Sequence, residues 1–522
     1  MNSMSGYRLG IDVGGTNTDV VLMHGREVVA TAKSFTTADV RSGVINAVTM
    51  ILDQAGEHRD AIGAVMIGTT QFVNAFVQRR GLAPVAVFRV SLPKADGVPP
   101  LTGWPDDLVE AAGDHIYMVG GGSLYTGKDY ASIDEDALRA AAIEAHDKGL
   151  KAVAISANFA PIRPDIEERA AEIVLSAIPD ARITLSHKVG GIGLIDRENA
   201  AIINAMLAEL SGQVIGSLES ALAELKIDAP IFISQNDGTL ITTEVAAAFP
   251  IFTCSAGPTN SIRGAAFLTG LDEAVVVDIG GTTSDIGFLL RGFPRETTAA
   301  NDIGGVRTNF RMPDVLSIGI GGGSLVRETE NGCTVGPTSV GYRLQEEGLV
   351  FGGSTLTATD IAVRAGQAEI GDAAKVAHLD AGLVEAALDD LHAQIEEAID
   401  HIKTSQHAIP LVLVGGGSIL IGRPLKGTSN VLRPDHASVA NAVGAAIALV
   451  SGRVDKLYDV AALGRDAAIA RAKDDATAEA VKAGARAEDV EIVEVVELPM
   501  THMKSGTVQI RVRAVGPLAM FA

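Results

Sequence analysis

Cysteine is almost absent from this chain. Cys254 and Cys333 are the only two among its 522 residues, which excludes a disulfide framework and a cysteine-rich metal site. We expect both to be small buried side chains rather than nucleophiles. The motifs H-E-x-x-H and G-x-S-x-G are missing as well, so zinc-peptidase and serine-hydrolase chemistry have no support.

Positive charge and aromatic side chains are also scarce. The sequence has 42 Lys and Arg residues against 64 Asp and Glu residues, a formal net charge of −22 at pH 7. Such a charge repels nucleic-acid backbones and anionic lipids, so we expect no nucleic-acid partner and no membrane partner. Because aromatic residues make up only 4% of the chain, the core must consist mainly of Ala, Val, Ile and Leu.

Long uncharged runs are missing too. The longest obvious one, residues 245–262, contains Pro250 and Pro258 and is typical of a turn-rich segment rather than a membrane span. The first residues, MNSMSGYRLG, show no basic stretch followed by an apolar one, as a secretory signal would. We therefore expect a cytoplasmic protein.

What the chain does contain is one pattern that occurs twice, far apart. LGIDVGGTNTDVVL at 9–22 and VVVDIGGTTSDIGFLL at 275–290 align from Asp12 and Asp278, and Asp19 and Asp285 also match. Glycine lets a ligand approach the backbone closely, and the converging N–H groups of such a turn can hold phosphate oxygens. The preceding carboxylate can hold Mg²⁺, usually through water. Two such turns facing each other would hold a polyphosphate from both sides.

Around these turns, apolar strands alternate with amphipathic helices, which predicts an α/β fold. Helices are expected at 37–56, 134–149 and 165–178, with one or two long helices at 194–226. The apolar run PLVLVGGGS at 410–418 predicts a buried strand followed by a glycine-rich turn. Beyond residue 455 the character changes to an Ala-rich helix over 460–484 and two alternating segments, which predicts a small α+β appendage.

One near-match to a phosphate-binding loop is misleading. GSLYTGKD at 122–129 approaches the G-x-x-x-x-G-K-[ST] pattern, but Asp129 stands where a hydroxyl should meet Mg²⁺. No helix is expected to begin at once after it. We therefore expect a polar turn rather than a nucleotide site.

With its duplicated turns, the sequence resembles the actin-like ATPase superfamily. The resemblance implies a ribonuclease H-like α/β fold, duplicated into two lobes around a nucleotide cleft, with ATP and Mg²⁺ as cofactors. We expect the first lobe at 7–198, the second at 199–454 with a small-residue helix at 436–451 near the cleft, and the C-terminal α+β domain at 455–522. Asp12 and Asp278 would be the catalytic carboxylates and would hold Mg²⁺ through water.

The predicted cofactor-binding residues lie in four short segments rich in glycine and hydroxyl groups. VLVGGGS at 412–418 resembles the adenosine-side motif of the superfamily. The residues are Gly14, Gly15, Thr16, Asn17 and Thr18; Gly280, Gly281, Thr282 and Thr283; Gly321, Gly322 and Gly323; and Gly415, Gly416, Gly417 and Ser418.

Further segments resemble the A-type ATPase subunit of the hydantoinase/oxoprolinase family. These are IGTTQFVNAFVQRRG at 67–81, FISQNDGTLITTEVAAAFPIFTCSAGPTNSIRGA at 232–265, SIGIGGGSLV at 317–326, VGPTSVG at 335–341 and TATD at 357–360. The sequence departs from the family where Ile67-Gly68 replaces His-Gly. It also departs where YRLQEEGLVFGG at 342–353 replaces the usual Pro-Gly-Pro-Ala-Cys-Tyr-Gly run.

The resemblance implies ATP-dependent hydrolysis of a cyclic amide or imide, such as a hydantoin, 5-oxoproline or a related lactam, through phosphorylation of the amide oxygen. It also implies an oligomer and a B-type hydantoinase subunit as partner. Thr69, Thr70 and Asn74 are candidates for the substrate side of the cleft, or for capping the helix that follows. A small-molecule kinase and an ATP-driven reactivating factor for a partner enzyme stay open as alternatives. So does the division of roles between Asp12 and Asp278.

Overall fold

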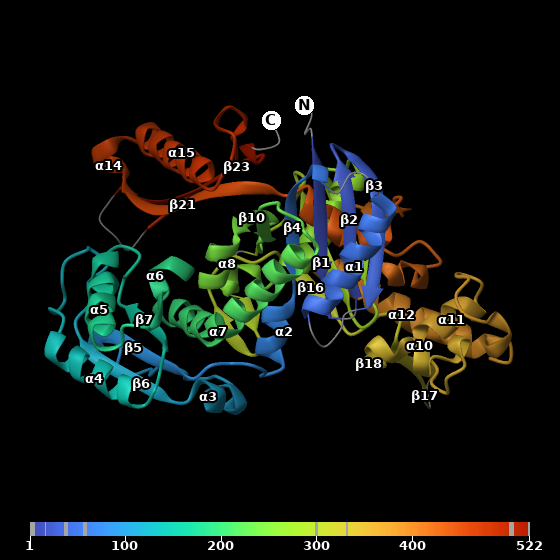
Figure 1. The fold of residues 1–522 in the computed structure, drawn as a ribbon, viewed down its shortest axis with the longest axis horizontal. Helices are drawn as coiled ribbons and strands as arrows, with labels where there is room; N and C mark the ends of the chain where they lie inside the picture. The colour runs from blue at the N-terminus through green and yellow to red at the C-terminus, as the bar shows by residue number, and fades with distance from the viewer. Residues whose placement is uncertain are drawn as a thin grey trace.

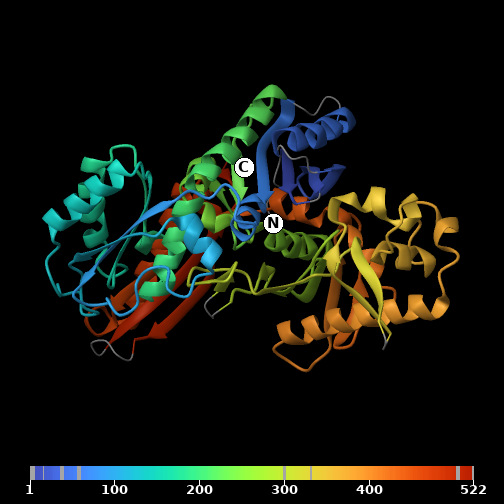
Figure 2. The same cartoon turned by 90° about the horizontal axis from the view of Figure 1, so that it is seen from below.

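The computed structural model describes residues 6–15, 17–35, 40–55, 60–297, 301–329, 332–500 and 506–519. Three larger sheets dominate these residues, with nine, six and four strands. Figure 1 shows the blue strands and the yellow-to-orange part on the right, the cyan part on the left, and the red C-terminal segment across the top. Figure 2, seen from below, separates the cyan part from the yellow-to-orange part along the long axis.

The nine-stranded sheet carries the first of the repeated turns. Its order is β22-β23-β21-β10-β9-β4-β1-β2-β3, with β1 antiparallel to β2 and parallel to β4. The strands are β1 Tyr7–Val13, β2 Asn17–His24, β3 Glu27–Phe35, β4 Ile62–Thr69, β9 Ile231–Ser234, β10 Thr239–Thr242, β21 Leu449–Asp459, β22 Glu491–Pro499 and β23 Thr507–Gly516.

Helices cover both faces of this sheet, because β1, β2 and β4 are apolar on both sides. On one face, Leu9 and Ile11 pack with helices α1 Val40–Ala55 and α7 Leu194–Glu224. On the other face, Val21 and Met23 pack with α13 Ala440–Ala446. Strands that are buried on both sides are typical of an α/β sheet, as expected.

The six-stranded sheet repeats this arrangement around the second turn. β11 Glu273–Ile279 is antiparallel to β12 Ser284–Leu290 and parallel to β19 Ile409–Val414, as β1 is to β2 and β4. Helix α12 Ala381–Ile402 covers one face and α9 Ala256–Thr269 the other. The remaining strands are β13 Phe293–Pro294, β16 Val315–Ile318 and β20 Thr428–Leu432. The expected duplication into two lobes is therefore present.

Helices α9 and α13 carry the chain between the lobes and cross each other very closely. A Cβ added at Gly264 of α9 would overlap the carbonyl oxygen of Ala440, and one added at Gly444 of α13 would overlap that of Asn260. Only glycine permits this approach. The small residues that predicted close packing at 436–451 thus serve this crossing. The expected helix is too long, however, because α13 ends at Ala446 and β21 begins at Leu449.

The third sheet belongs to an insert between β4 and α7. Its strands β5 Val85–Leu92, β6 His115–Gly120, β7 Ala152–Ala157 and β8 Arg182–Leu185 are parallel, in the order β6-β5-β7-β8. Helices α4 Glu135–Asp147 and α5 Pro164–Ala177 pack on it. Residues 122–129 form a polar turn, as predicted: the amide of Leu124 donates to Lys128 and Asp129 pairs with Arg163.

The C-terminal residues form the expected helix and strands, but they join the first lobe's sheet. Helix α15 Arg465–Lys482 packs a row of alanines at four-residue spacing against β21 and β23. β9 and β10, although they follow residue 198, also lie in that sheet. The sheets therefore do not end at the boundaries predicted after residues 198 and 454, because strand order in space does not follow order in the sequence.

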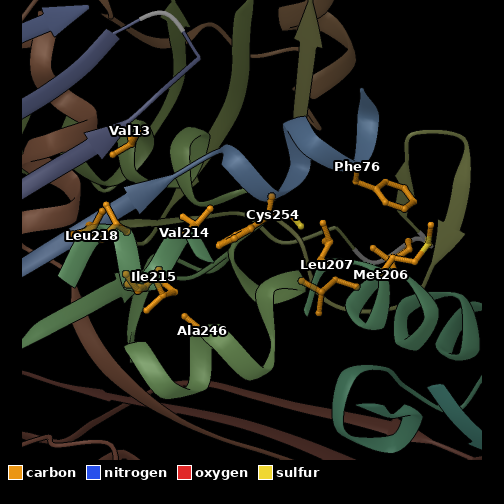
Figure 3. Packing of buried hydrophobic residues seen from close by; sticks show 14 of the residues in the cluster. Val13, Phe76, Met206, Leu207, Val214, Ile215, Leu218, Ala246 and Cys254 are labelled. Carbon is orange, nitrogen blue, oxygen red and sulfur yellow. The ribbon is translucent and has the colours of Figure 1, made fainter. Parts of the chain in front are cut away.

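Among the described helices, α7 alone is long and apolar enough to cross a bilayer, and 67% of its most apolar window is buried inside the protein. Figure 3 shows why: Met206, Leu207, Val214, Ile215 and Leu218 of α7 face Phe76, Ala246 and Cys254. Such burial inside the protein is typical of a helix that belongs to the core. Cys254 is 3% exposed, and burial raises the pKa of its thiol to about 12, so it is a buried side chain as expected.

Candidate nucleotide and metal site

The two repeated hairpins place two pairs of carboxylates at the same structural position. Asp12 lies opposite Asp19 in the β1–β2 register, and Asp278 lies opposite Asp285 in the β11–β12 register. Opposed residues of a strand pair point to the same face of the sheet. The structure therefore confirms that the sequence repeat is a repeat in three dimensions.

The two pairs of carboxylates lie close enough for the charge of one pair to act on the other. Burial, and then the charges of Asp19 and Asp278, raise the pKa of Asp12 to about 7. Burial also raises the pKa of Asp278, which the hydroxyl of Ser261 partly offsets, and it raises that of Asp285 to about 6. Three carboxylates with raised pKa values at one site indicate a deficit of positive charge that a bound cation would correct.

The first pair is held by a chain of polar contacts. Asn441 donates its side-chain N–H groups to Asp12 Oδ2 at 3.0 Å and to Asp19 Oδ2 at 2.9 Å. Lys33 Nζ pairs with Asp19 Oδ1 at 2.8 Å. Lys33 lies opposite Asp19 in the β2–β3 register, so the hairpin itself brings this charge to the site.

Helix α9 supplies one residue to each pair. Ser261 donates its hydroxyl to Asp278 Oδ2. Asn260, the preceding residue, lies beside Asp12 at Gly68, where an added Cβ would overlap both side chains. Because α9 joins the lobes, its two neighbouring residues serve carboxylates from different halves of the chain.

These residues fit a hydrated Mg²⁺. Asp12 Oδ1 and both polar atoms of the Asn260 side chain are buried, with no hydrogen-bond partner among the described residues. Buried polar atoms normally have partners, so these mark a place that a ligand or its water completes. No group of three or more His, Cys, Asp or Glu side chains in the described ranges is placed to hold a metal directly. Contact of Asp12 and Asp278 with Mg²⁺ through its water stays a prediction.

The two glycine turns close in the same way. The amide of Gly14 donates to the carbonyl of Asn17 at 3.0 Å, and that of Gly280 to the carbonyl of Thr283 at 2.9 Å. Gly15 is exposed, and Asn17, Gly281 and Thr282 are half-buried, so both turns reach the protein surface. Thr16, also predicted to bind the cofactor, lies outside the described residues.

Two predictions about cofactor contacts need correction. Thr18 is fully buried, on the opposite face of β2 from Asp19, because successive strand residues alternate in direction. The run at 321–323 is also buried, and its amides already have acceptors: Gly321 donates to Ser324 Oγ, Gly322 to Gly280 O and Gly323 to Gly281 O. These glycines support the second turn from behind instead of presenting amides to a ligand.

The glycine run after β19 lies beside the second turn. The amide of Gly415 donates to the carbonyl of Ala437, and a Cβ at Gly417 would overlap the side chain of Ile279. Gly416 is exposed with open space around it, and Ser418 is half-buried. This position, at the carboxyl end of a strand parallel to β11, suits the predicted adenosine-side loop.

The residues predicted for the substrate side lie next to the first turn. The amide of Thr70 donates to the carbonyl of Val13, and Asn74 Nδ2 donates to Thr70 Oγ1 at 3.2 Å. A Cβ at Gly15 would be 3.7 Å from Asn74 Nδ2. Thr69 is buried, and its hydroxyl accepts from the amide of Gln71 at the start of helix α2 Gln71–Val77. Thr70 and Asn74 thus lie at the turn, whereas Thr69 supports the helix start.

Sequence reasoning missed the residues that hold the carboxylates, namely Lys33, Gly68, Asn260, Ser261 and Asn441. The register of the β2–β3 hairpin could have paired Lys33 with Asp19. Gly68, Asn260 and Ser261 lie inside the segments that resemble the family, but nothing in those segments connects them with Asp12 or Asp278. Asn441 lies outside these segments.

Two family sequence models match the chain. The model described as "Hydantoinase/oxoprolinase N-terminal region" matches residues 8–178, and the one described as "Hydantoinase/oxoprolinase" matches residues 197–372. Together they include both turns, Thr69, Thr70 and Asn74, and the glycines at 321–323.

Individual relatives agree with these matches. Caprolactamase subunit alpha of Pseudomonas jessenii is 27% identical over 441 residues, which is 80% of this chain and 62% of that protein. Acetophenone carboxylase gamma subunit of Aromatoleum aromaticum is 26% identical over 392 residues, 67% of this chain and 52% of that protein. The chain thus spans between half and two thirds of the length of these relatives.

A solved structure supports the architecture. The crystal structure of ATP-dependent caprolactamase from Pseudomonas jessenii matches with a TM-score of 0.76 at 20% identity, covering 98% of this chain and 88% of that one. At this identity the likeness concerns the fold alone. It confirms the expected duplicated, actin-like ATPase fold.

Proposed function

Because the chain belongs to the hydantoinase/oxoprolinase family, we propose that it is the ATP-dependent part of an enzyme that opens a cyclic amide or imide. A single observation carries this proposal: Asp12 and Asp278 lie near each other at the ends of two equivalent glycine turns, one from each lobe. The name of one relative, caprolactamase subunit alpha, supports a lactam as the class of substrate.

The chemistry follows from the strength of the amide bond. The strength of its resonance is seen in the barrier to rotation about the C–N bond, ~18–20 kcal/mol. Direct attack of water on the carbonyl carbon would have to break this resonance. Transfer of the γ-phosphoryl group of ATP to the amide oxygen forms an O–P bond and releases ADP, and it removes that resonance. Water then adds to the activated carbon, and the C–N bond breaks as the nitrogen takes a proton, which leaves an acyl phosphate on the opened chain. A second water releases phosphate from it and leaves the carboxylate. The sum is lactam, ATP and two waters giving a ring-opened amino acid, ADP and phosphate.

The residues at the site supply what phosphoryl transfer needs, namely positioning and charge stabilisation. The turns at Gly14 and Gly280 would hold the phosphates from both sides, and Gly416 would face the nucleoside. Asp12 and Asp278 would orient the attacking oxygen and hold metal-bound water between them. Mg²⁺, when bound, would neutralise charge on the transferred phosphoryl group.

The same proposal includes a partner. Both curated relatives are named as subunits, and this chain spans only part of their length. We propose that a B-type subunit provides the surface on which the activated ring is hydrolysed. Thr70 and Asn74, which lie beside the first turn, would contact the ring while its oxygen is phosphorylated.

The test is phosphate release by the purified chain, with and without any co-purifying subunit, against hydantoin, 5-oxoproline and caprolactam. We expect one ring to stimulate Mg²⁺-dependent release of phosphate together with the ring-opened acid. The variant Asp12→Asn should abolish the stimulation.

A stable phosphorylated product would instead identify a small-molecule kinase. ATP hydrolysis indifferent to every ring, in tight complex with a large enzyme, would identify a reactivating factor. Consumption of bicarbonate with a ketone would identify a carboxylase. Each of these outcomes overturns the proposal.

A further inference from the structure

Asn441 occupies a junction between the two lobes and the carboxylates. It is the second residue of α13, whose following residues pack on the first lobe's sheet. The segment just before α13 is bound to the second lobe instead, because Ala437 accepts the amide of Gly415 at 2.9 Å. Only three residues therefore separate Ala437, which contacts the glycine run after β19, from Asn441, which contacts Asp12.

The contacts of Asn441 leave one oxygen of Asp12 without a partner. Asn441 takes Oδ2, while Oδ1 is buried with no hydrogen bond among the described residues. Both oxygens of Asp19 are engaged, one by Asn441 and one by Lys33. Asp19 thus holds Asn441 in place, while Asp12 Oδ1 has the side chain of Asn260 beside it, which favours the charged form of Asp12.

The second lobe has the same row of positions with different side chains. Across β4, β1, β2 and β3 the row is Gly68, Asp12, Asp19 and Lys33; across β19, β11, β12 and β16 it is Val414, Asp278, Asp285 and Ser317. Ser317 donates to Asp285 and Ser261 to Asp278. Among the described residues, no cation pairs with the second pair. The two halves of the duplicated site therefore differ in how their carboxylates are held.

We propose that Asn441 is a positioning residue that links the glycine run at Gly415 to the orientation of Asp12, with Asp19 and Lys33 holding Asn441 from behind. The start of α13 lies on a connection between the lobes, where α9 and α13 cross in close backbone contact at Gly264 and Gly444. A nucleotide seated on the second lobe would thereby turn Asp12 Oδ1 toward Mg²⁺. This inference rests on the proposed function and specifies how nucleotide and metal are coupled within it.

The test compares the full chain with the variants Asn441→Leu and Lys33→Met and their combination. Leucine keeps the size of asparagine and removes both donors. Groups that orient a metal-holding residue typically contribute 10–100-fold to metal affinity or activity. We expect Asn441→Leu to raise the Mg²⁺ concentration for half-maximal phosphate release about tenfold, with ADP affinity in the absence of Mg²⁺ kept within about twofold. The enhancement of ADP binding by Mg²⁺ should fall by the same factor, because linkage is reciprocal.

Lys33→Met should shift the Mg²⁺ dependence less, by about threefold, since its ammonium is partly exposed. The double variant should resemble Asn441→Leu alone, because the two residues act through one chain of contacts. If the shifts in Mg²⁺ dependence caused by the two substitutions multiply in the double variant, the anchoring role of Lys33 is wrong. If Asn441→Leu does not fold, the shift in Lys33→Met still decides: an unchanged Mg²⁺ dependence overturns the proposal.

A matched control is Asn430→Leu, an exposed asparagine on β20 of the second lobe. It should leave all of these quantities within about twofold. If the unmodified chain binds ADP and Mg²⁺ but Asn441→Leu behaves like this control, the positioning role is wrong while the proposed function stands. If the unmodified chain binds no nucleotide, the proposed function itself fails.

Discussion

Gly68 lies directly opposite Asp12 in the parallel pairing of β4 with β1, and a Cβ at Gly68 would overlap Asp12 Oδ1. It would also overlap the amide nitrogen of Asn260. The absence of a side chain at this one position therefore gives the buried carboxylate and the buried amide the space that they occupy. A residue without a side chain thus determines the space around Asp12.

We predict that Gly68→Ala reduces Mg²⁺-dependent phosphate release by about tenfold or more, because the added methyl group displaces Asp12. Overpacking should also lower the free energy of unfolding by about 1–3 kcal/mol. Gly212→Ala on α7 is the matched control, since a Cβ there meets nothing within 4 Å. Alanine should raise helix stability at that position by about 0.5–1 kcal/mol. Equal activity of the two variants would contradict the assignment of Gly68.

A second prediction concerns a buried network of charges that joins the C-terminal strands to both lobes. Arg513 on β23 pairs with Glu296 at 3.1 Å and lies 3.8 Å from Asp237, and Arg453 on β21 also pairs with both. Asp237 is 3% exposed, and Arg453 stays paired with it when Arg513 is removed, so the substitution takes away only part of the compensating charge.

We therefore expect Arg513→Met to lower the free energy of unfolding by about 1.5–3 kcal/mol, measured by urea denaturation, because it removes a charged hydrogen bond to Glu296. The control is Lys151→Met, which removes an exposed pair with Asp180 and should change stability by less than about 1 kcal/mol. Similar effects of the two substitutions would show that the network is not a stabilising link between the appendage and the lobes.

Local sequence patterns predicted the parts of the fold that depend on neighbouring residues. Periodicity located the strands around both turns and the helix of small residues near α13, and the repeat placed Asp12 and Asp278 in equivalent positions. Partner choice among distant strands is different, because any apolar strand can add to a sheet. Local patterns therefore offer no reason to place β9, β10 and β21 in the same sheet as β4.

Direct ligand contact was also harder to predict than the position of a loop. Gly321, Gly322 and Gly323 have the composition of a ligand-binding turn, but their amides are used within the protein. Whether an amide is free depends on tertiary contacts. Asn441 shows the opposite error: an asparagine among alanines carries no local signal, yet it contacts two carboxylates.

The cysteines provide a third prediction. Cys254 is 3% exposed and its thiol has a pKa raised by burial to about 12, whereas Cys333 is partly exposed. A thiol-specific reagent should thus modify one cysteine readily in the native protein and both in denaturant. Cys254→Ala should keep phosphate release within about twofold of the unmodified chain. Loss of activity with retained folding would instead indicate a nucleophile.

The fourth prediction is a pH dependence of stability in the protein without metal. Burial and the charges of Asp19 and Asp278 raise the pKa of Asp12 to about 7, whereas an aspartate in the unfolded chain ionises near ~3.9. Between these values the folded protein binds the proton more tightly than the unfolded chain, so its stability must fall as pH rises from about 4 to 7 and then level off. Asp12→Asn cannot ionise and lacks this loss, so it should become the more stable form at pH 8, by up to about 4 kcal/mol.

Unfolding of both forms in chelator at pH 5 and pH 8 measures the difference. Mg²⁺ added at pH 8 should restore stability to the unmodified chain and not to the variant, because the cation removes the repulsion that the carboxylates otherwise bear. If the free energy of unfolding varies with pH in the same way in both proteins, ionisation of Asp12 is not opposed by the neighbouring carboxylates. The metal site would then have to lie elsewhere.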